Sequence, residues 1–448
     1  MALSTNSIAQ KLACIIGEAS VVSWQDLTTI QRHRLAQAVH PESSVDCIAY
    51  PNTQVELSEI VACANHHRWR ILACGAGTKL SWGALARGTN LIISTERLNC
   101  LIEHAAGDLT VTVEAGIPLS TLQVALRAAS QFLALDPAYS DQATVGGIVA
   151  TRDAGSLQQR YGGIRDMCLG IALVRADGQK VKAGGRVVKN VAGYDLMKLL
   201  AGSFGTLGII SEVTLRLYPV PEAAKTVLLF GSAEFVAQTQ KNLCSSNLTP
   251  TAMDLLSRRT LAALEMAGEL GLVVRFQSLQ PSVDLQSDRL LEVGQALGLQ
   301  GKIWAAPEEA NIWQLVQHQV WQSKLSKNQP IVCKVGVLPS EAVRTLTTIE
   351  AICEQQGAIC KALIHAGNGL GVVRIDCAAG IAAKTILRLR SSCNQANGFL
   401  TVLEAPATLK EELDVWGYTG NALACMRQIK HQFDPENLFG FNRFIGGI

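Results

Sequence analysis

The sequence has no strong excess of either charge and no hydrophobic run long enough to cross a bilayer. Its 39 Lys and Arg residues nearly balance 37 Asp and Glu residues, which leaves a formal net charge of +2. Because binding to nucleic-acid phosphates needs concentrated positive charge, we expect no nucleic-acid partner. The first residues also lack the basic-then-apolar pattern of a secretion signal. These absences predict a cytoplasmic protein with no transmembrane segment.

Cysteine spacings typical of metal centres are also missing. The 13 cysteines are odd in number and scattered, with no C-x-x-C pair and no Cys/His pairing at zinc spacing. We interpret them as reduced and mostly buried thiols of a cytosolic protein. A metal site or an iron–sulfur cluster held by this chain is therefore not expected.

The composition that is present is typical of a globular protein. Hydrophobic residues make up 48% of the chain and charged residues 17%, which excludes a disordered chain. At roughly 100–200 residues per domain, the length allows two to four domains. Pro219 and Pro221 mark the clearest domain boundary, because proline continues neither a helix nor a central strand. Glycine is dense before this boundary and sparser after it.

Hydrophobic periodicity predicts both helices and strands, and hence an α+β fold class. The Ala-Asp-Gly triplet at 176–178 predicts a type I′ hairpin turn, and helices are expected after Thr53 and after Pro118. Before the boundary, strands are expected at 70–73, 91–94, 110–114 and 209–217. After it, strands of an antiparallel sheet are expected at 226–230, 271–276, 331–338, 359–365, 371–376 and 400–403.

Two glycine-containing bends have the composition of a phosphate-binding site. The segment 74–79 (Cys-Gly-Ala-Gly-Thr-Lys) follows a predicted strand, and 143–147 (Ala-Thr-Val-Gly-Gly) precedes a short helical run. Glycine leaves main-chain N–H groups open to an anion, and the start of a helix favours phosphate through its unpaired N–H groups. Neither bend matches the three-glycine dinucleotide motif or the P-loop. This pattern is consistent with two interpretations, a tight turn between strands and a diphosphate site.

Four stretches between Cys47 and Pro219 together resemble the FAD-binding domain of vanillyl-alcohol-oxidase-type (PCMH-type) flavoproteins, a group that includes D-lactate and glycolate dehydrogenases. The stretches are 75–79, 135–147, 185–196 and 202–214. Within this group, Lys-Asn-Val-Ala-Gly-Tyr-Asp at 189–195 is similar to the E subunit of glycolate oxidase, also called glycolate dehydrogenase. The segments 415–418, 426–430 and 433–435 resemble the same subunit.

This resemblance implies a PCMH-type FAD-binding domain of two α+β subdomains and a cap domain with an antiparallel sheet. The chain would then consist of a helical N-terminal extension (1–46), the FAD-binding domain (47–220), the cap (221–405) and a C-terminal segment (406–448) that returns to the FAD domain. The residues implied for cofactor binding are Gly75, Ala76, Gly77, Thr78, Lys79, Thr144, Gly146, Gly147, Gly205 and Ile210.

The activity that the resemblance implies is oxidation of glycolate, a 2-hydroxy acid, to glyoxylate, with electrons passing from FAD to an acceptor other than oxygen. The implied partners are a flavoprotein subunit and an iron–sulfur subunit, through which the chain would lie peripherally at a membrane. Two alternatives stay open. One is a dehydrogenase that acts alone on another D-2-hydroxy acid, and the other is a non-catalytic scaffold subunit that keeps the fold.

The sequence departs from the family at positions that carry its chemistry. The family motif His-Ala-Gly-Asp-Gly-Asn-x-His corresponds here to 365–372, with Asn368 in place of the Asp and without the second histidine. One imidazole cannot form the family's metal pair, so no metal is expected. No histidine occurs in 75–90, where the family attaches its linked flavins, so FAD is expected to be non-covalent. The family's terminal Asn-Pro-Gly-Arg is altered to Phe-Asn-Arg-Phe at 441–444.

The catalytic residues stay unidentified, with three weak candidates. Lys189 would stabilise a flavin anion or a carboxylate by its charge, and Tyr194 would face the flavin or its substrate. His365 would accept a proton. The competing interpretation is structural: 194–200 opens an amphipathic helix capped by Asp195, and His365 is a histidine satisfied within the fold.

Overall fold

The computed structural model describes residues 7–187, 193–322 and 329–448, and it divides into two compact units. Unit 1 consists of Met1–Ala154, Gly162–Val220 and Tyr418–Ile448. Unit 2 consists of Gly155–Tyr161 and Pro221–Gly417. In the described part of the chain, no helix combines the length and the apolar character needed to span a membrane.

The first sheet of unit 1 has the strand order β1-β2-β4-β3. Its strands are β1 (Val21–Ser23), β2 (Cys47–Ala49), β3 (Arg70–Cys74) and β4 (Thr89–Ser94). β4 runs parallel to both of its neighbours, whereas β1 pairs with β2 in antiparallel fashion. Two helices, α1 (Ile8–Ile16) and α3 (Gln54–His67), supply Leu12 and Leu57 to the core that also buries Ile71 of β3. The strand predicted at 70–73 is therefore confirmed, and it ends where the first glycine bend begins.

The start of α3 also follows its sequence signal. Thr53 is the N-cap, and its Oγ1 accepts a hydrogen bond of 3.1 Å from Glu56 N. The Glu56 carboxylate accepts instead from Asn52 N at 2.8 Å, one residue before the cap. The helix start is thus satisfied by two local hydrogen bonds.

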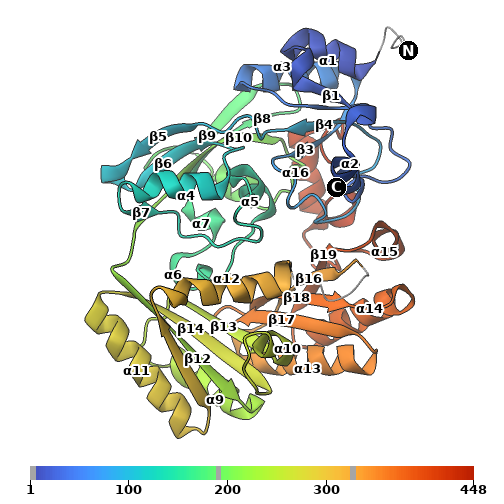
Figure 1. The fold of residues 1–448 in the computed structure, drawn as a ribbon. Helices are drawn as coiled ribbons and strands as arrows, with labels where there is room; N and C mark the ends of the chain where they lie inside the picture. The colour runs from blue at the N-terminus through green and yellow to red at the C-terminus, as the bar shows by residue number, and fades with distance from the viewer. Residues whose placement is uncertain (1–6, 188–192, 323–328) are drawn as a thin grey trace. The chain divides into compact units, whose positions relative to one another are not determined.

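The second sheet of unit 1 is antiparallel throughout, with the order β5-β6-β10-β8-β9. Its strands are β5 (Leu101–Ala105), β6 (Thr110–Glu114), β8 (Cys168–Val174), β9 (Lys180–Gly184) and β10 (Ile209–Arg216). The short helix α5 (Val145–Thr151) packs against β10. Helix α4 (Leu119–Arg127) lies beside α5 in Figure 1. A two-stranded sheet of β7 (Gln131–Phe132) and β11 (Tyr218–Pro219) closes this part.

The hairpin predicted at 176–178 connects β8 and β9, but its turn type differs from the prediction. Gly178 has a φ of +81°, and Asp177 is not among the residues with positive φ. Gly178 N donates to Arg175 O at 2.9 Å, and Arg175 N donates to Gln179 O at 3.0 Å. This is a longer hairpin loop in which one glycine takes the left-handed conformation. The prediction of a two-residue type I′ turn is therefore wrong.

Unit 2 is built on one eight-stranded antiparallel sheet of order β15-β12-β14-β13-β17-β18-β16-β19. The strands are β12 (Ala223–Gly231), β13 (Ala252–Ser257), β14 (Leu270–Ser278), β15 (Gln300–Ala305), β16 (Ile331–Gly336), β17 (Ile359–His365), β18 (Leu370–Asp376) and β19 (Phe399–Glu404). All six strands predicted after the boundary are present. β13 and β15 were missed, because Asp254 interrupts the apolar run of β13 and β15 alternates between exposed and half-buried positions.

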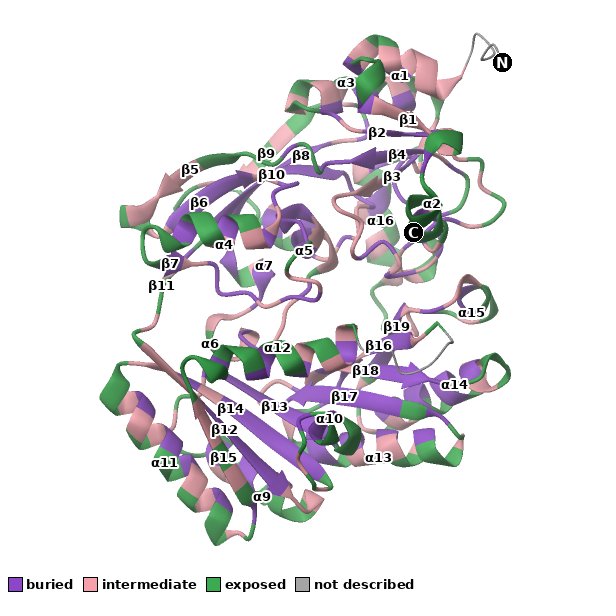
Figure 2. Cartoon of the chain, viewed as in Figure 1, coloured by how far each residue is buried: buried purple, intermediate pink, exposed green. Residues whose placement is uncertain are grey.

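Helices cover both faces of this sheet. α12 (Glu308–Trp321) packs on one face, where Val316 and Val320 share a core with Leu228 of β12. Adjacent Leu229 points to the opposite face, where it contacts Gly294 of α11 (Gln280–Ala296). Among the described residues, six more α-helices belong to unit 2: α6 (Gln158–Tyr161), α9 (Ala233–Cys244), α10 (Arg258–Ala262), α13 (Ala342–Gln355), α14 (Ala379–Gln395) and α15 (Ala407–Glu412). Figure 2 shows the strands of this sheet as mostly buried. The α+β class and the antiparallel second sheet are thus confirmed.

The C-terminal part of unit 1 is held by a buried ion pair. Lys430 near the end of α16 (Leu423–Phe433) lies 2.6 Å from the carboxylate of Asp434, and both side chains are almost fully buried. Lys430 Nζ also donates to Thr206 O at 2.8 Å and to Phe439 O at 2.9 Å. Asp434 accepts from Leu438 N and Phe439 N, each at 2.8 Å. Desolvation lowers the pKa of Lys430, although the Asp434 carboxylate acts in the opposite direction.

We expect Asp434→Asn to lower the free energy of unfolding of unit 1 by about 3–5 kcal/mol, because it leaves the Lys430 cation buried without its counter-ion. The matched control is Glu436→Gln, which removes an exposed partner of Arg68 and should cost less than about 1 kcal/mol. Urea unfolding followed by intrinsic fluorescence measures both variants. Equal stability of the two variants would contradict a structural role for the buried pair.

Candidate functional site

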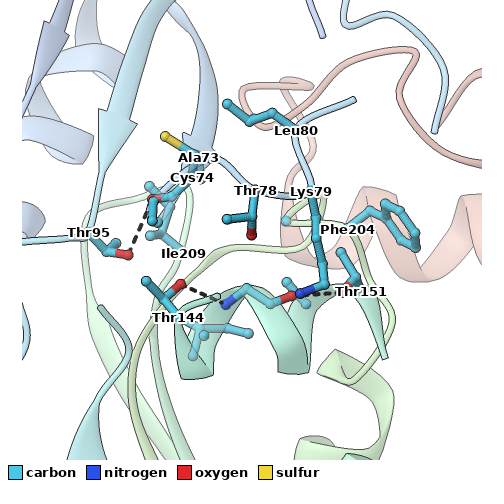
Figure 3. Close-up of a pocket in the computed structure, with 18 of the residues that line it drawn as sticks. Ala73, Cys74, Thr78, Lys79, Leu80, Thr95, Thr144, Thr151, Phe204 and Ile209 are labelled. Carbon is cyan, nitrogen blue, oxygen red and sulfur yellow. Dashed lines mark hydrogen bonds between the residues drawn. The ribbon is translucent and has the colours of Figure 1, made fainter. Parts of the chain in front are cut away.

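A cavity with about 710 Å³ of empty space, open solvent included, lies in unit 1. Three segments line it: 73–80 after β3, 144–151 with α5, and 204–210 leading into β10. Thr95 and Arg443 complete the lining. Figure 3 shows Thr78, Thr144 and Phe204, one from each segment, around the same space.

All ten residues predicted for cofactor binding line this cavity. Five of them, 75–79, belong to the first lining segment, and Thr144, Gly146 and Gly147 belong to the second. Gly205 and Ile210 come from the third. Tertiary folding therefore brings together three glycine-containing segments that are far apart in the sequence.

The first bend leaves its main-chain N–H groups without protein acceptors. Within the described residues, the N–H groups of 75–78 donate to no protein oxygen. The carbonyls of the same bend are held, because Arg34 Nη1 donates to Ala76 O at 3.2 Å and Ser94 Oγ donates to Gly75 O at 3.3 Å. Gly77 has a φ of +73°, a conformation that glycine adopts without strain. A row of N–H groups fixed at a cavity wall in this way is suited to an oxyanion.

The second bend provides a wall rather than donors, which corrects the expectation that both bends offer free N–H groups. Gly146 N donates to Ala115 O at 2.7 Å, and Gly147 N donates to Thr144 Oγ1 at 3.4 Å. Val145 N donates to Ile117 O at 3.0 Å. The first turn of α5 is thus satisfied within the protein, so this helix start has no N–H groups left for an anion.

The two bends touch each other at Gly75. A Cβ added there would lie 2.1 Å from Thr144 Oγ1, far inside contact distance. A Cβ at Gly146 would lie 2.7 Å from Ala115 Cβ. Neither glycine has a positive φ, so glycine is needed at both positions for close approach of two segments rather than for an unusual backbone conformation.

The third segment exposes its main chain to the cavity. Gly205 has a φ of +71°, and a Cβ there would meet only Ala73 Cβ at 3.9 Å. Phe204 also takes the left-handed conformation, with a φ of +54°. A ligand can therefore approach the backbone closely at Gly205, whereas the other two bends approach each other.

The cavity lining contains two cations with different surroundings. Lys79 Nζ lies 3.3 Å from the carboxylate of Asp153 and donates to Ala138 O at 3.1 Å, so its charge is balanced by a buried acid. Arg443 is the second cation, and our sequence reasoning did not assign it to the site. The sequence did hold one signal for it: the family resemblance places the C-terminal segment, which contains Arg443, against the FAD domain. Burial raises the pKa of the Cys74 thiol to about 12, so this cysteine is neutral and serves packing.

The three catalytic candidates do not line this cavity. Lys189 lies outside the described residues. The Tyr194 side chain is exposed, with a relative accessibility of 92%. Asp195 is the N-cap of α8 (Leu196–Leu200), but its side chain makes no cap hydrogen bond and pairs instead with Lys198 at 3.0 Å. His365 belongs to unit 2.

His365 is part of a buried cluster that sequence reasoning missed. Its Nδ1 lies 2.6 Å from Asp254 Oδ1, and Ser156 Oγ donates to Asp254 Oδ2 at 2.5 Å. The partners are 111 and 98 residues apart in the sequence, so no local pattern could have revealed them. Among the described residues, no three His, Cys, Asp or Glu side chains converge in a way that could hold a metal ion. In this cluster, the Asp254 carboxylate instead holds the His365 imidazole in one orientation.

The geometry of the cavity lining is by itself suited to FAD. A diphosphate requires hydrogen-bond donors that need no other partner, and the first bend supplies a row of them. A cofactor that lies close to the backbone requires positions without side chains, and Gly205 provides one. The cationic Arg443 in the lining favours a ligand with negative charge.

Comparison with known proteins agrees with this fit. The FAD binding domain family matches residues 45–184. Glycolate oxidase subunit GlcD of Bacillus subtilis (strain 168) is 32% identical over 232 residues, which cover 52% of this chain and 49% of that protein. Glycolate oxidase subunit GlcE of Escherichia coli (strain K12) is 36% identical over 151 residues, which cover 34% and 43%. The mitochondrial D-lactate dehydrogenase [cytochrome] of Arabidopsis thaliana is 25% identical over 422 residues, which cover 89% and 73%.

A solved structure shows the same fold over almost the whole chain. p-Cresol methylhydroxylase with bound substrate has a TM-score of 0.76 at 15% identity, with 97% of this chain and 96% of that chain covered. The chain spans only about half the length of the B. subtilis relative, so substrate and partners do not follow from that match. The fold, the FAD-binding domain and the cavity that fits the cofactor agree with one another. Residues 45–184 match the FAD binding domain family, the chain shares the fold of p-cresol methylhydroxylase, and FAD is its cofactor.

Proposed function

We propose that this chain is the FAD-binding subunit of a glycolate dehydrogenase, which oxidises glycolate to glyoxylate and passes the electrons to partner subunits rather than to oxygen. The proposed partners are a second flavoprotein and an iron–sulfur protein. Relatives named glycolate oxidase subunits support the substrate class. Relatives named D-lactate and D-2-hydroxyglutarate dehydrogenases also act on 2-hydroxy acids, so they support the same reaction.

The observation that carries the proposal is the row of N–H groups at 75–78, which line the cavity and have no acceptor among the described protein residues. We assign this row to the diphosphate of FAD, and we assign the Thr144, Gly146 and Gly147 wall and the Gly205–Ile210 segment to other parts of the same cofactor. No histidine is present in 75–90, which supports non-covalent attachment. FAD, when bound, supplies the acceptor of two electrons that the oxidation of an alcohol requires.

His365 is our proposal for the group that takes the hydroxyl proton of the substrate. The Asp254 carboxylate beside Nδ1 favours the tautomer with the proton on Nδ1, which makes Nε2 the basic nitrogen. Burial of both side chains fixes the orientation of the ring. Ser156 holds the second oxygen of Asp254, so the carboxylate is fixed as well.

Absorption spectra test the proposed function directly. The purified protein is expected to carry flavin absorption that bleaches when glycolate is added without oxygen, alone or with its partner subunits. Bleaching by glycolate alone would support a self-sufficient enzyme, and bleaching only by D-lactate or D-2-hydroxyglutarate would reject glycolate as the substrate. Protein that carries flavin but stays oxidised with every acid, even with partners, would indicate a scaffold subunit.

Gly75→Ala should abolish retention of FAD, because the new Cβ would overlap Thr144 Oγ1 and displace the row of N–H groups. The matched control is Gly107→Ala, where a Cβ meets nothing within 4 Å. The ratio of flavin to protein absorbance after gel filtration measures retention, and circular dichroism checks the fold. Normal flavin content in a folded Gly75→Ala protein would show that the bend does not bind the cofactor.

His365→Gln should slow flavin reduction by at least about 100-fold, the typical contribution of a positioned proton acceptor, and should leave the FAD content unchanged. The control is His318→Gln on α12 of the same unit. Stopped-flow absorbance measures the rate of flavin reduction. The protein is used alone or with its partner subunits, whichever preparation reduces the flavin. An unchanged rate would assign His365 a structural role.

A further inference from the structure

Each N–H group of 75–78 belongs to a peptide unit whose carbonyl oxygen already accepts a hydrogen bond. Thr95 N donates to Cys74 O at 2.8 Å, and Thr95 Oγ1 donates to the same oxygen at 3.2 Å, as Figure 3 shows. Ser94 Oγ donates to Gly75 O at 3.3 Å. In a planar trans peptide the C=O and N–H groups point in opposite directions. A donor that holds the carbonyl therefore also fixes the direction of the N–H group in the same unit.

Arg34 supplies the charged donor of this set. Its Nη1 donates to Ala76 O at 3.2 Å, and this carbonyl shares a peptide unit with the N–H group of Gly77. The remaining carbonyl, Gly77 O, accepts from Leu80 N at 3.3 Å. Among the described residues, the other donors to the carbonyls of 74–77 are neutral hydroxyl and main-chain N–H groups. Hydrogen bonds in a chain polarise one another, and a cationic donor acts more strongly than a neutral one, so Arg34 strengthens Gly77 N–H as a donor.

The absence of a side chain at Gly77 lets Arg34 come this close. A Cβ added at Gly77 would lie 3.4 Å from Arg34 Cδ and 3.3 Å from Leu80 Cδ1. The aliphatic part of the arginine therefore runs beside the bend, and its guanidinium reaches the carbonyl of the preceding residue.

The helix that carries Arg34 is fixed in unit 1 by its neighbours. Arg34 lies in the last turn of α2 (Thr29–Ala36), and the next residue, Leu35, shares a buried core with Leu72 of β3. After the helix, Ala86 N donates to Ala38 O and His40 N donates to Ala86 O, each at 2.8 Å. The contact of Arg34 with the first bend thus belongs to a docked segment.

The charge of Arg34 is not balanced by an acid of the protein. Within the described part of the chain, its guanidinium donates to Ala76 O and forms no ion pair. The side chain is exposed, so solvent and salt screen its charge in part. A diphosphate at the first bend would bring negative charge close to this cation, on a peptide that the cation already polarises.

We propose that Arg34 is a positioning residue for the diphosphate of FAD, which acts through the peptide unit between Ala76 and Gly77. It orients and polarises Gly77 N–H, and its charge attracts the diphosphate. This inference rests on the proposed location of FAD at the first bend. The helical N-terminal extension, which no sequence motif assigned to the site, then takes part in cofactor binding.

Titration of flavin-stripped full-length protein with FAD, followed by flavin fluorescence, tests this role. Arg34→Met should weaken FAD binding about tenfold, near the lower end of the range for a hydrogen bond from a charged group because the side chain is exposed. Arg34→Lys keeps the charge and one donor for a single acceptor, and should stay within about threefold of the wild type. Circular dichroism checks the fold of each variant.

Arg32→Met is the matched control for the change in net charge. Arg32 lies on the same helix and is exposed, and its side chain makes no hydrogen bond or ion pair among the described residues. Its replacement should change FAD affinity by less than about twofold. A loss as large as that of Arg34→Met would overturn the inference, because the effect would then come from net charge and not from the contact with Ala76.

Salt dependence separates an electrostatic role from a purely structural one. The ratio of the FAD dissociation constants of Arg34→Met and wild type should fall from about tenfold at about 0.05 M salt to about threefold or less at about 1 M, because salt screens the charge of an exposed arginine. A ratio that salt does not change would overturn the inference and make Arg34 only a clamp for the bend.

The remaining outcomes separate this inference from the proposed function. Wild-type protein that takes up no FAD would reject both together. Equal FAD affinity of wild type and a folded Arg34→Met variant would overturn only the inference. An Arg34→Lys variant that binds FAD no better than Arg34→Met would also overturn it, because positive charge at this position would then not help FAD to bind.

Discussion

The close contact between Gly75 and Thr144 is the constraint on which the cavity of unit 1 depends. The missing side chain at Gly75 lets the first bend pack directly against the cap residue of α5. This contact, with the hydrogen bonds from Arg34 and Ser94 to its carbonyls, fixes the bend beside the cavity. A side chain at this position would push the two segments apart.

Two buried lysines of unit 1 are paired with buried carboxylates. Lys79 with Asp153 and Lys430 with Asp434 are paired within the protein, so each cation has a carboxylate nearby. These pairs serve the architecture: one fixes the wall of the cavity, and the other holds the turn that leads into the C-terminal segment. A third buried cation, Arg443, donates to Leu80 O at 2.6 Å and lines the cavity.

In unit 2, the segment that corresponds to the family motif keeps one histidine, and neighbouring side chains orient it. The segment at 365–372 has one histidine and Asn368, and no metal-binding group is formed among the described residues. His365 is nevertheless fixed by Asp254, which in turn is held by Ser156 from the excursion Gly155–Tyr161. A single oriented imidazole is sufficient to accept a proton, whereas a metal site requires several ligands.

The sequence by itself determined what depends on neighbouring residues along the chain. Periodicity located β3, β6 and the six predicted strands of unit 2, and the four motif segments indicated the family and the ten cavity residues. What only the tertiary structure decided depends on segments far apart. In the described part of the chain, the N–H groups of 75–78 have no acceptor, whereas those of 145–147 are satisfied by Ile117 O, Ala115 O and Thr144 Oγ1. Arg443 reaches the cavity, and Asp254 reaches His365, only because sheets bring distant strands together. Local sequence specifies which groups can donate or carry charge, but packing decides which of them the protein itself has already used.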